Sequence, residues 1–438
     1  MRRTSTLTAG LLALLLALLA VPVAMAQVTG LYYKEVEKDG RIYVFNTPER
    51  YSSWQQSGDM GTAVTLINRG PNGETVMAEN ETAMDLYLYK HNLDPYERPT
   101  PKPAAGPAAY PSTRINGRVF ADVSAKENKD EATGVKSSDS GVGVDVKRFY
   151  FTLSHDFDPV WSALFQSDIG DQGTRRYDVF VKKAYVQAKL APEATFRLGS
   201  ADTPWVPFVE GLYGYRYVEQ VLTDHLSFGT SADWGLHFLG KAGVVSYAAA
   251  ALNGKGYSNP TRTQSVDFEG RLSVEPIPGL TLGVGGYSGK RGNDTGAAPL
   301  VRHTAERQDA AVAWVSDRFR LGGEYFAAKN WNNVTSILTD KADGYSLWGS
   351  VSPVDHLSIF GRYDGVKPSK DLKPNLKLNY YNAGLQWRFN KVVAGSLVYK
   401  HEEVKGGTFS TGNGTIGSTN VLQKGEYNEL GVFVLYDF

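Results

Sequence analysis

The chain ends in ELGVFVLYDF (residues 429–438), and this stretch decides what kind of fold to expect. Every second side chain is apolar, and these side chains share one face: Leu430, Val432, Val434, Tyr436 and Phe438. The intervening side chains, from Glu429 to Asp437, are mixed. Because successive side chains of a β-strand point to opposite sides, this pattern predicts a strand whose two faces meet different media. The apolar medium is either a protein core or lipid.

Residues 1–26 have the features of a cleaved export signal. Arg2 and Arg3 precede an apolar run over residues 11–23, and Ala24 and Ala26 supply the small side chains that a signal peptidase reads. The run is shorter than the roughly 20 residues that a membrane-spanning helix needs. We therefore expect a signal peptide over residues 1–26 and an exported mature chain.

The composition excludes several classes of protein. After the signal, no stretch approaches 18 consecutive apolar residues, so a helical membrane protein is not expected. The chain has no cysteine, which excludes a disulfide framework, thiolate metal sites and haem attachment through CxxCH. The 46 basic and 46 acidic residues balance and give no indication of nucleic-acid binding. The 25 tyrosines suit interfaces at which one end of the ring contacts water, and the 46 glycines suit turns and tight strands.

One break in composition divides the chain. The stretch PYERPTPKPAAGPAAYPST (residues 95–113) is rich in proline and predicts a stiff, extended linker. Before it, residues 27–94 predict a small α+β domain in the periplasm. Asp39-Gly40 is a favoured hairpin turn, Thr47-Pro48 begins a helix, and a second turn at residues 71–73 precedes a second helix. The sequence of this module does not indicate its role.

From residue 114 onward, the sequence consists of short runs in which apolar and polar residues alternate. Short and long connectors alternate strictly between these runs. Seven connectors are tight, for example Asp158-Pro159 and Asn390-Lys391, and eight are long and polar, so that sixteen strands are predicted. A soluble β-protein has no reason to place every short turn at one end, whereas a transmembrane barrel does. We therefore expect an all-β fold over residues 114–438, a sixteen-stranded antiparallel barrel in the Gram-negative outer membrane with both chain ends in the periplasm.

The alternation also predicts which side chains face the inside of the barrel. In VKRFYFTLSH (residues 146–155), Phe149, Phe151 and Leu153 are expected to face lipid, while Arg148 faces the lumen. Charges of both signs recur in the inner register: Asp168, Lys183, Arg197, Asp267, Glu269, Arg271, Arg320, Glu324, Arg362, Asp364, Arg388, Lys400 and Glu429. A dry core would not carry so many charges, because their desolvation is costly. We therefore predict a water-filled lumen, lined among others by Arg362, Arg388 and Lys400.

Four segments carry a family resemblance: KRFYFTLSHDFDPVWSALFQSDIG (147–170), VKKAYVQAKLAPEATFRLGSADTP (181–204), VEQVLTDHLSFGTSADWGLHFLG (218–240) and AGLQWRFNKVVAGSLVYKHEE (383–403). They resemble segments of the phosphate-selective porins of the O and P type. The resemblance implies a homotrimeric channel in which the loop after the fifth strand folds inward. The terminal strand is similar to that of Gram-negative outer-membrane barrels, whose closing aromatic residues, here Tyr436 and Phe438, are read by the outer-membrane assembly machinery. Such a barrel would contact membrane lipid and lipopolysaccharide.

On this resemblance the inward loop is residues 203–231, and its many aromatic side chains suit a loop folded into a barrel. The candidate constriction combines Glu210, Arg216, Glu219 and Asp224 of the loop with Arg148, Asp168, Lys183 and Arg197 of the wall. Selectivity for phosphate needs an excess of positive charge at the narrowing, which this set lacks. The expected function is passive diffusion of ions and small hydrophilic solutes, and a preference for anions such as phosphate is left open.

Other functions are alternatives. The seven histidines form no HExxH and no spacing typical of a metal site, so neither a metal nor another cofactor is expected. No motif favours an outer-membrane barrel enzyme. The barrel could instead be a scaffold that encloses a partner, for example an electron-transfer protein, although an inward loop would obstruct it. The small domain could tether the barrel to the cell wall.

Overall fold

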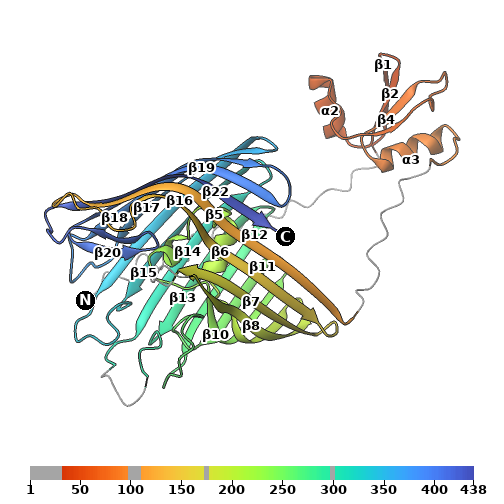
Figure 1. Ribbon diagram of the computed structural model, residues 1–438. Coiled ribbons are helices and arrows are strands. Elements are labelled where there is room, and N and C mark those ends of the chain that lie inside the picture. Colours follow the sequence, from red (N-terminus) through yellow and green to blue (C-terminus); the bar gives the residue numbers. More distant parts are fainter. Residues whose placement is uncertain (1–31, 97–109, 172–176, 296–300) are drawn as a thin grey trace, which may run out of the picture. The chain divides into compact units, whose positions relative to one another are not determined.

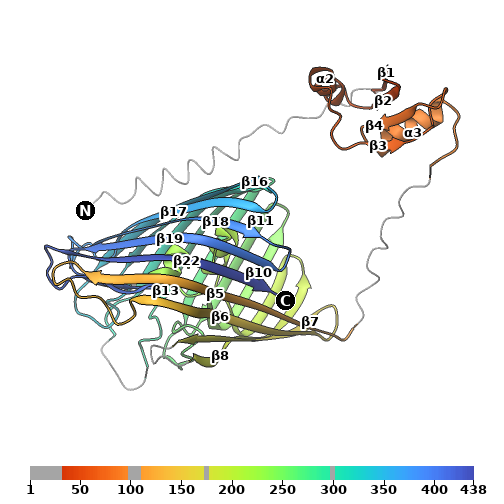
Figure 2. The ribbon, with the colours of Figure 1, turned by 45° about the horizontal axis from the view of Figure 1, so that its top comes forward.

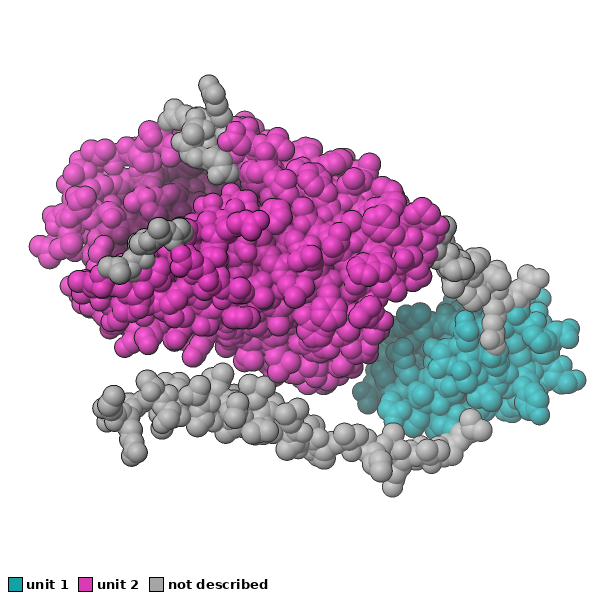
Figure 3. Space-filling view, turned by 90° about the horizontal axis from the view of Figure 1, so that it is seen from below, with its two compact units in different colours: residues 1–105 teal, residues 106–438 magenta. Residues whose placement is uncertain are grey.

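The computed structural model describes residues 32–96, 110–171, 177–295 and 301–438. The expected signal peptide and most of the expected linker lie outside these ranges. The chain divides into two compact units, residues 1–105 and 106–438, which Figure 3 shows in different colours. In the described ranges, no helix is long and apolar enough to cross a membrane.

The first unit is a four-stranded sheet with two helices. Its elements are β1 (Lys34–Lys38), β2 (Arg41–Phe45), α2 (Pro48–Ser57), β3 (Val64–Leu66), β4 (Thr75–Ala78) and α3 (Glu81–Lys90). The strands lie in the order β1-β2-β4-β3, with β2 and β4 parallel. Val44 packs with Tyr87 of α3, and Phe45 packs with Trp54 of α2. Because Val44 and Phe45 are neighbours in one strand, the two helices cover opposite faces of the sheet. The predicted α+β fold of this unit is confirmed.

The first turn and the first helix of this unit form where the sequence predicts them. Asp39 and Gly40 both have positive φ (53° and 69°), as a two-residue hairpin turn of type I′ requires. Pro48 lies in the first turn of α2, where its missing N–H leaves no helical hydrogen bond unmade. Thr47 precedes the helix as predicted, but its hydroxyl donates to Glu79 (3.0 Å) and does not cap the helix.

The second unit is a closed barrel of sixteen strands, drawn from two directions in Figures 1 and 2. The strands are β5 (Ser112–Asp130), β6 (Gly141–Asp156), β7 (Trp161–Asp171), β8 (Tyr177–Ala191), β9 (Ala194–Asp202), β10 (Ala232–Ala242), β11 (Val245–Leu252), β12 (Asp267–Ile277), β13 (Leu280–Gly289), β14 (Ala305–Val315), β15 (Phe319–Lys329), β16 (Lys341–Val354), β17 (Leu357–Lys367), β18 (Lys377–Arg388), β19 (Val393–Lys405) and β22 (Lys424–Asp437). Each strand pairs antiparallel with its neighbours, and β22 closes the ring by pairing with β5. The predicted strand number and arrangement are confirmed.

Two connectors of the barrel contain further elements. Between β9 and β10 lie the helices α4 (Val206–Tyr213) and α5 (Leu222–His225). Between β19 and β22 lies a hairpin of two short strands, β20 (Thr408–Thr411) and β21 (Gly414–Gly417). Both connectors join the ends of strands at which the sequence predicts long loops.

The C-terminal stretch forms β22, and its two faces differ as predicted. Leu430 and Val432 are 54% and 47% exposed, whereas Phe433 is fully buried. After the strand, Phe438 exchanges two backbone hydrogen bonds with Gly117 of β5 (2.8 and 2.9 Å). A Cβ at Gly117 would lie 1.9 Å from the ring of Phe438. The terminal aromatic side chain therefore fits at the closing seam because its neighbour is glycine.

The outer surface of the barrel carries a row of tyrosines on β15 to β19: Tyr325, Tyr345, Tyr363, Tyr381 and Tyr399, all 40–47% exposed. Tyr325 is paired with Tyr345, and Tyr363 with Tyr381, across neighbouring strands. The ring centroids of Tyr345 and Tyr363, and those of Tyr381 and Tyr399, are 6.1 Å apart. An aromatic band of this kind is typical of transmembrane barrels at the level of the membrane–water interface.

Candidate channel constriction

The loop between β9 and β10, residues 203–231, lies inside the barrel. It contains α4 and α5, and its side chains pack against strands from several parts of the wall. Pro207 occupies the first turn of α4, and Gly214 ends this helix with a φ of 80°. A Cβ at Gly214 would meet the guanidinium of Arg320 at 2.9 Å, so the loop approaches the wall closely. The inward loop that the resemblance implies is therefore present, and we call it the constriction loop.

Aromatic residues hold one side of the constriction loop against the wall. Tyr215 stacks on Phe360 of β17 with a centroid distance of 4.2 Å, and Phe228 lies 4.7 Å from Phe326 of β15. Trp205 is fully buried. Each buried ring removes a large apolar area from water, at about 25 cal/mol per Å². This burial stabilises an irregular segment inside a polar lumen and explains why the loop is rich in rings.

Charged wall residues bind the loop backbone on the same side. Carboxylates accept hydrogen bonds from loop N–H groups, Glu269 from Trp205 (3.1 Å) and Glu324 from Leu222 (2.8 Å). Basic side chains donate to loop carbonyls: Arg271 to Pro204 (3.1 Å), Arg320 to Leu212 (2.9 Å), Arg307 to Phe228 and Arg362 to Gln220. The wall thus satisfies backbone groups that an irregular segment cannot satisfy by itself. We call this part of the barrel, β12 to β19, the covered side.

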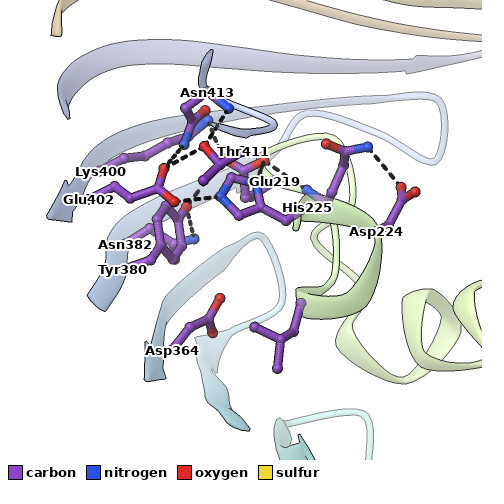
Figure 4. Close-up of polar contacts among 12 residues, drawn as sticks. Glu219, Asp224, His225, Asp364, Tyr380, Asn382, Lys400, Glu402, Thr411 and Asn413 are labelled. Atoms are coloured by element: carbon purple, nitrogen blue, oxygen red, sulfur yellow. Dashed lines mark hydrogen bonds and ion pairs between the residues drawn. The ribbon is translucent and has the colours of Figure 1, made fainter. Parts of the chain in front are cut away.

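A buried charge network fixes the second half of the constriction loop (Figure 4). A carboxylate oxygen of Glu219 lies 3.3 Å from Nζ of Lys400, and the other lies 3.4 Å from Nδ1 of His225. Nε2 of His225 lies 3.0 Å from Glu402. Burial alone would lower the pKa of His225, but Glu402 and Glu219 raise it to about 10. Burial would raise the pKa of Glu219, but Lys400 and His225 hold it well below its usual range. Both loop residues are therefore charged and paired.

Two residues predicted to line the lumen are covered by this loop. Arg362 and Lys400 point into the barrel, as the alternation predicts, but they are only 4% and 1% exposed. Arg362 donates to Asp364 (2.9 Å), and Lys400 lies 3.0 Å from Glu429. Their contacts with Gln220 and Glu219 make them attachment points for the loop. Arg388, the third residue predicted to line the lumen, is exposed at the end of β18.

The other side of the constriction loop faces β5 to β9, which we call the open side. Predicted constriction residues form ion pairs here: Arg216 with Glu210 (2.6 Å) and Asp224 (3.6 Å), Arg148 with Asp168 (2.9 Å), and Lys183 with Asp202 (2.5 Å). Two predicted residues do not join them. Glu219 belongs to the covered side, and Arg197 donates to Gln187 (2.8 Å) on the wall.

Lys182 is a residue of the open side that strict alternation misses. A bulge between β7 and β8 pairs Lys183 with Gln166 and Val181 with Ser167, so Lys182 is the extra residue. With Lys183 inside, alternation would place Lys182 in lipid, but the bulge turns it inward. Its Nζ donates to the hydroxyl of Tyr150 (3.1 Å) and lies 5.5 Å from the ring of Tyr257.

Two cavities lie beside the constriction loop inside the barrel, the outer one against β10 to β14 and the inner one against the open side. The outer cavity, about 360 Å³, is bordered by Asp224 and Tyr257 and lies toward the long loops. The inner cavity, about 680 Å³, is bordered by Lys182, Tyr150 and Arg216 and lies toward the chain end. Arg216 lies 3.6 Å from Asp224, and Lys182 lies 5.5 Å from the ring of Tyr257, so side chains that border the two cavities contact one another here. We call these five residues the waist.

A sixteen-stranded barrel with an inward loop and a polar waist has the architecture of the outer-membrane porins. The chain is similar in structure to an anion-selective porin from Comamonas acidovorans (13% identity, 75% of this chain and 100% of that chain covered, TM-score 0.54). It is also similar to the outer membrane channel DcaP of Acinetobacter baumannii (10%, 75% and 97%, 0.53) and to a loop L8 deletion mutant of OmpT, an outer membrane protein of Vibrio cholerae (13%, 75% and 100%, 0.51). At these identities the likeness shows the porin fold and not a type of porin.

No family model and no curated protein matches the sequence. Within the described ranges, no group of three or more metal-ligating side chains is arranged to hold an ion. The phosphate-selective O and P type therefore stays a prediction, and so does the expected lack of a cofactor.

Proposed function

We propose that the chain is an outer-membrane porin through which ions and small hydrophilic solutes diffuse. One observation carries this proposal: the barrel encloses two cavities, and the charged and hydroxyl side chains of the waist lie where their borders contact. Such borders offer hydrated solutes the hydrogen bonds and charges that replace part of their water shell. The outward row of tyrosines on β15 to β19 supports a membrane setting.

The proposal includes the setting that the sequence predicts. The chain would be exported by its signal peptide and inserted by the outer-membrane assembly machinery through the strand that ends in Tyr436 and Phe438. The barrel would contact lipid and lipopolysaccharide, and it would form a homotrimer, as the resemblance implies. The small α+β domain would lie in the periplasm, joined to the barrel by the proline-rich linker.

The charges of the waist support a weak preference for anions. The inner cavity is bordered by four basic and three acidic side chains. Three of the basic residues are paired: Arg118 with Asp437 (2.5 Å), Lys183 with Asp202 and Arg216 with Glu210. Lys182 forms no ion pair with any residue that the structure describes. One unpaired ammonium group attracts anions weakly, and phosphate is one such anion, whereas strong selectivity needs a ring of basic side chains.

Planar lipid bilayers test the proposal. Purified protein should insert with stepwise increases in ionic conductance, and the reversal potential in a salt gradient should show a small preference for anions. Resistance of the unheated barrel to SDS confirms that the protein is folded. Folded protein that leaves the bilayer silent would contradict the channel.

The alternative of a scaffold that encloses a partner is not favoured, because the constriction loop occupies the lumen and is bound to the covered side. The expectation that the chain is not an enzyme, and the idea that the small domain tethers the barrel to the cell wall, stay predictions.

A further inference from the structure

The connector between β19 and β22 carries a second element that folds inward. Its hairpin, β20 and β21, contacts β5, β19 and β22. Asn128, in the inner register of β5, donates to the carbonyl of Thr415 (3.0 Å). Ile416 is 1% exposed and lies in an apolar cluster with Leu222 of α5 and Tyr380 of β18. The hairpin is therefore packed against the inside of the barrel.

The tip of this hairpin meets the constriction loop. The N–H of Gly412 donates to the carbonyl of His225 at the end of α5 (2.8 Å). A Cβ at Gly412 would lie 2.5 Å from Oε1 of Gln220 and 2.8 Å from Nδ1 of His225. The approach is thus so close that glycine is the residue that fits. Thr411 and Gly412 also border the outer cavity, so the hairpin forms part of its wall.

A single carboxylate joins the hairpin to the constriction loop (Figure 4). Glu402 of β19 is fully buried. One of its oxygens lies 3.0 Å from Nε2 of His225. The other accepts hydrogen bonds from the hydroxyl of Thr411 (3.1 Å) and the amide of Asn413 (2.9 Å). Since His225 is also paired with Glu219, the hairpin, the wall and the constriction loop share one buried polar network.

We propose that Glu402 is a positioning residue that couples the hairpin to the constriction loop, so that the outer cavity and the waist open and close together. The hairpin narrows the outer cavity while its tip holds the end of α5. Release of the hairpin removes Thr411 and Asn413 from Glu402, and removal of Glu402 leaves the hairpin and His225 without the carboxylate that they share. This inference rests on the proposed function, because it assumes that solutes pass through the outer cavity.

Three variants test this coupling in planar bilayers. Gly412→Val places a branched side chain against Gln220 and His225 and should displace the hairpin, with a higher unitary conductance and more frequent transitions between conductance levels. Glu402→Gln keeps the size and the hairpin hydrogen bonds but removes the charge that faces His225. It should increase the transitions with a smaller change in conductance. Glu402→Ala should show both effects.

Two matched controls belong to this experiment. Ser410→Val changes an exposed residue of the same hairpin. Glu403→Gln changes the next residue of β19, which faces the other way and pairs with Lys405 (2.6 Å) and Lys424 (2.8 Å). Both should behave like the wild type, and all variants should remain resistant to SDS before heating.

A proximity measurement separates this inference from the proposed function. The chain has no cysteine, so Gln220→Cys with Asn413→Cys, which leaves Gly412 in place beside Gln220, offers a pair for a short thiol-reactive cross-linker. A cross-link should form in folded protein and should suppress the transitions. A silent wild type would contradict the channel itself. A conducting wild type whose Gly412→Val and Glu402→Gln variants keep its conductance and its transitions would overturn the coupling, and so would a failure to cross-link.

Discussion

The covered side and the open side of the lumen use similar residues in different ways. On the covered side, Arg307 is fully buried and bound to Asp309, Glu269 and a loop carbonyl. On the open side, Lys182 is also buried (6% exposed), but its ammonium group contacts a tyrosine hydroxyl and tyrosine rings at the border of a cavity of about 680 Å³. Both side chains point inward. What separates them is their partners: Arg307 is held by two carboxylates, whereas Lys182 has no ion pair among the described residues. We therefore expect an inward charge to act as an attachment point on the covered side and as a selectivity determinant on the open side.

The largest change in conductance should follow from removing the part of the constriction loop that covers the wall. Replacement of residues 211–228 by a short glycine–serine linker should raise unitary conductance on the order of twofold or more, because the segment fills the lumen that the two sides share. Bilayer recordings measure this directly. Shortening the exposed β5–β6 loop at residues 132–139 should leave conductance unchanged. Equal conductance of the two deletion variants would show that the constriction loop does not narrow the path.

The free energy of unfolding should show how far the covered side depends on its buried ion pairs. Arg307→Met leaves Asp309 and Glu269 buried without their partner, and we expect a loss of about 3–5 kcal/mol in the free energy of unfolding. Urea unfolding of the barrel in lipid vesicles measures it. Arg318→Met removes an exposed ion pair with Asp355, in which the side chains are 62% and 78% exposed, and should change stability by less than about 0.5 kcal/mol. Similar losses in both variants would mean that the covered side does not depend on buried charge.

Two lysine variants, one on each side of the lumen, test whether the open side determines selectivity and the covered side determines stability. Lys182→Gln removes the unpaired cation of the waist and should move the reversal potential toward cations, with a stability change within about 1 kcal/mol. Lys400→Gln removes the nearest cation of Glu219 and Glu429, which then keep His225 (3.4 Å) and Lys147 (3.6 Å) respectively, and should cost about 3 kcal/mol while selectivity hardly changes. Reversal potentials and urea unfolding are recorded for both proteins. If the two variants exchange these effects, the assignment of the sides is wrong.

The barrel could be predicted from sequence because successive side chains of a strand point to opposite faces, and the two faces of a barrel strand meet different media. The faces of β22, where Val432 is exposed and Phe433 is buried, follow directly from ELGVFVLYDF. The inward direction of Arg362 and Lys400 also follows from alternation, but their burial does not, since it depends on where a distant loop lies. Lys182 is missed because a bulge of one residue shifts the register without a change in residue type.

The smallest effect on conductance should come from a change in pH, and it concerns His225, which the covered side holds. Glu402 and Glu219 raise the pKa of His225 to about 10, against an ordinary value of 6.5. Because the folded protein holds this proton more tightly, the contribution of His225 to stability is fully present below about pH 6.5, declines above it and is lost as the pH rises through about 10. In the folded channel His225 stays charged up to that pH, so conductance and its transitions should be constant from pH 6.5 to about 9 and change only near pH 10. Bilayer recordings of the wild type and of His225→Gln over this pH range measure the conductance and its transitions. A change already between pH 6.5 and 8 would show that the covered side does not hold a charged His225.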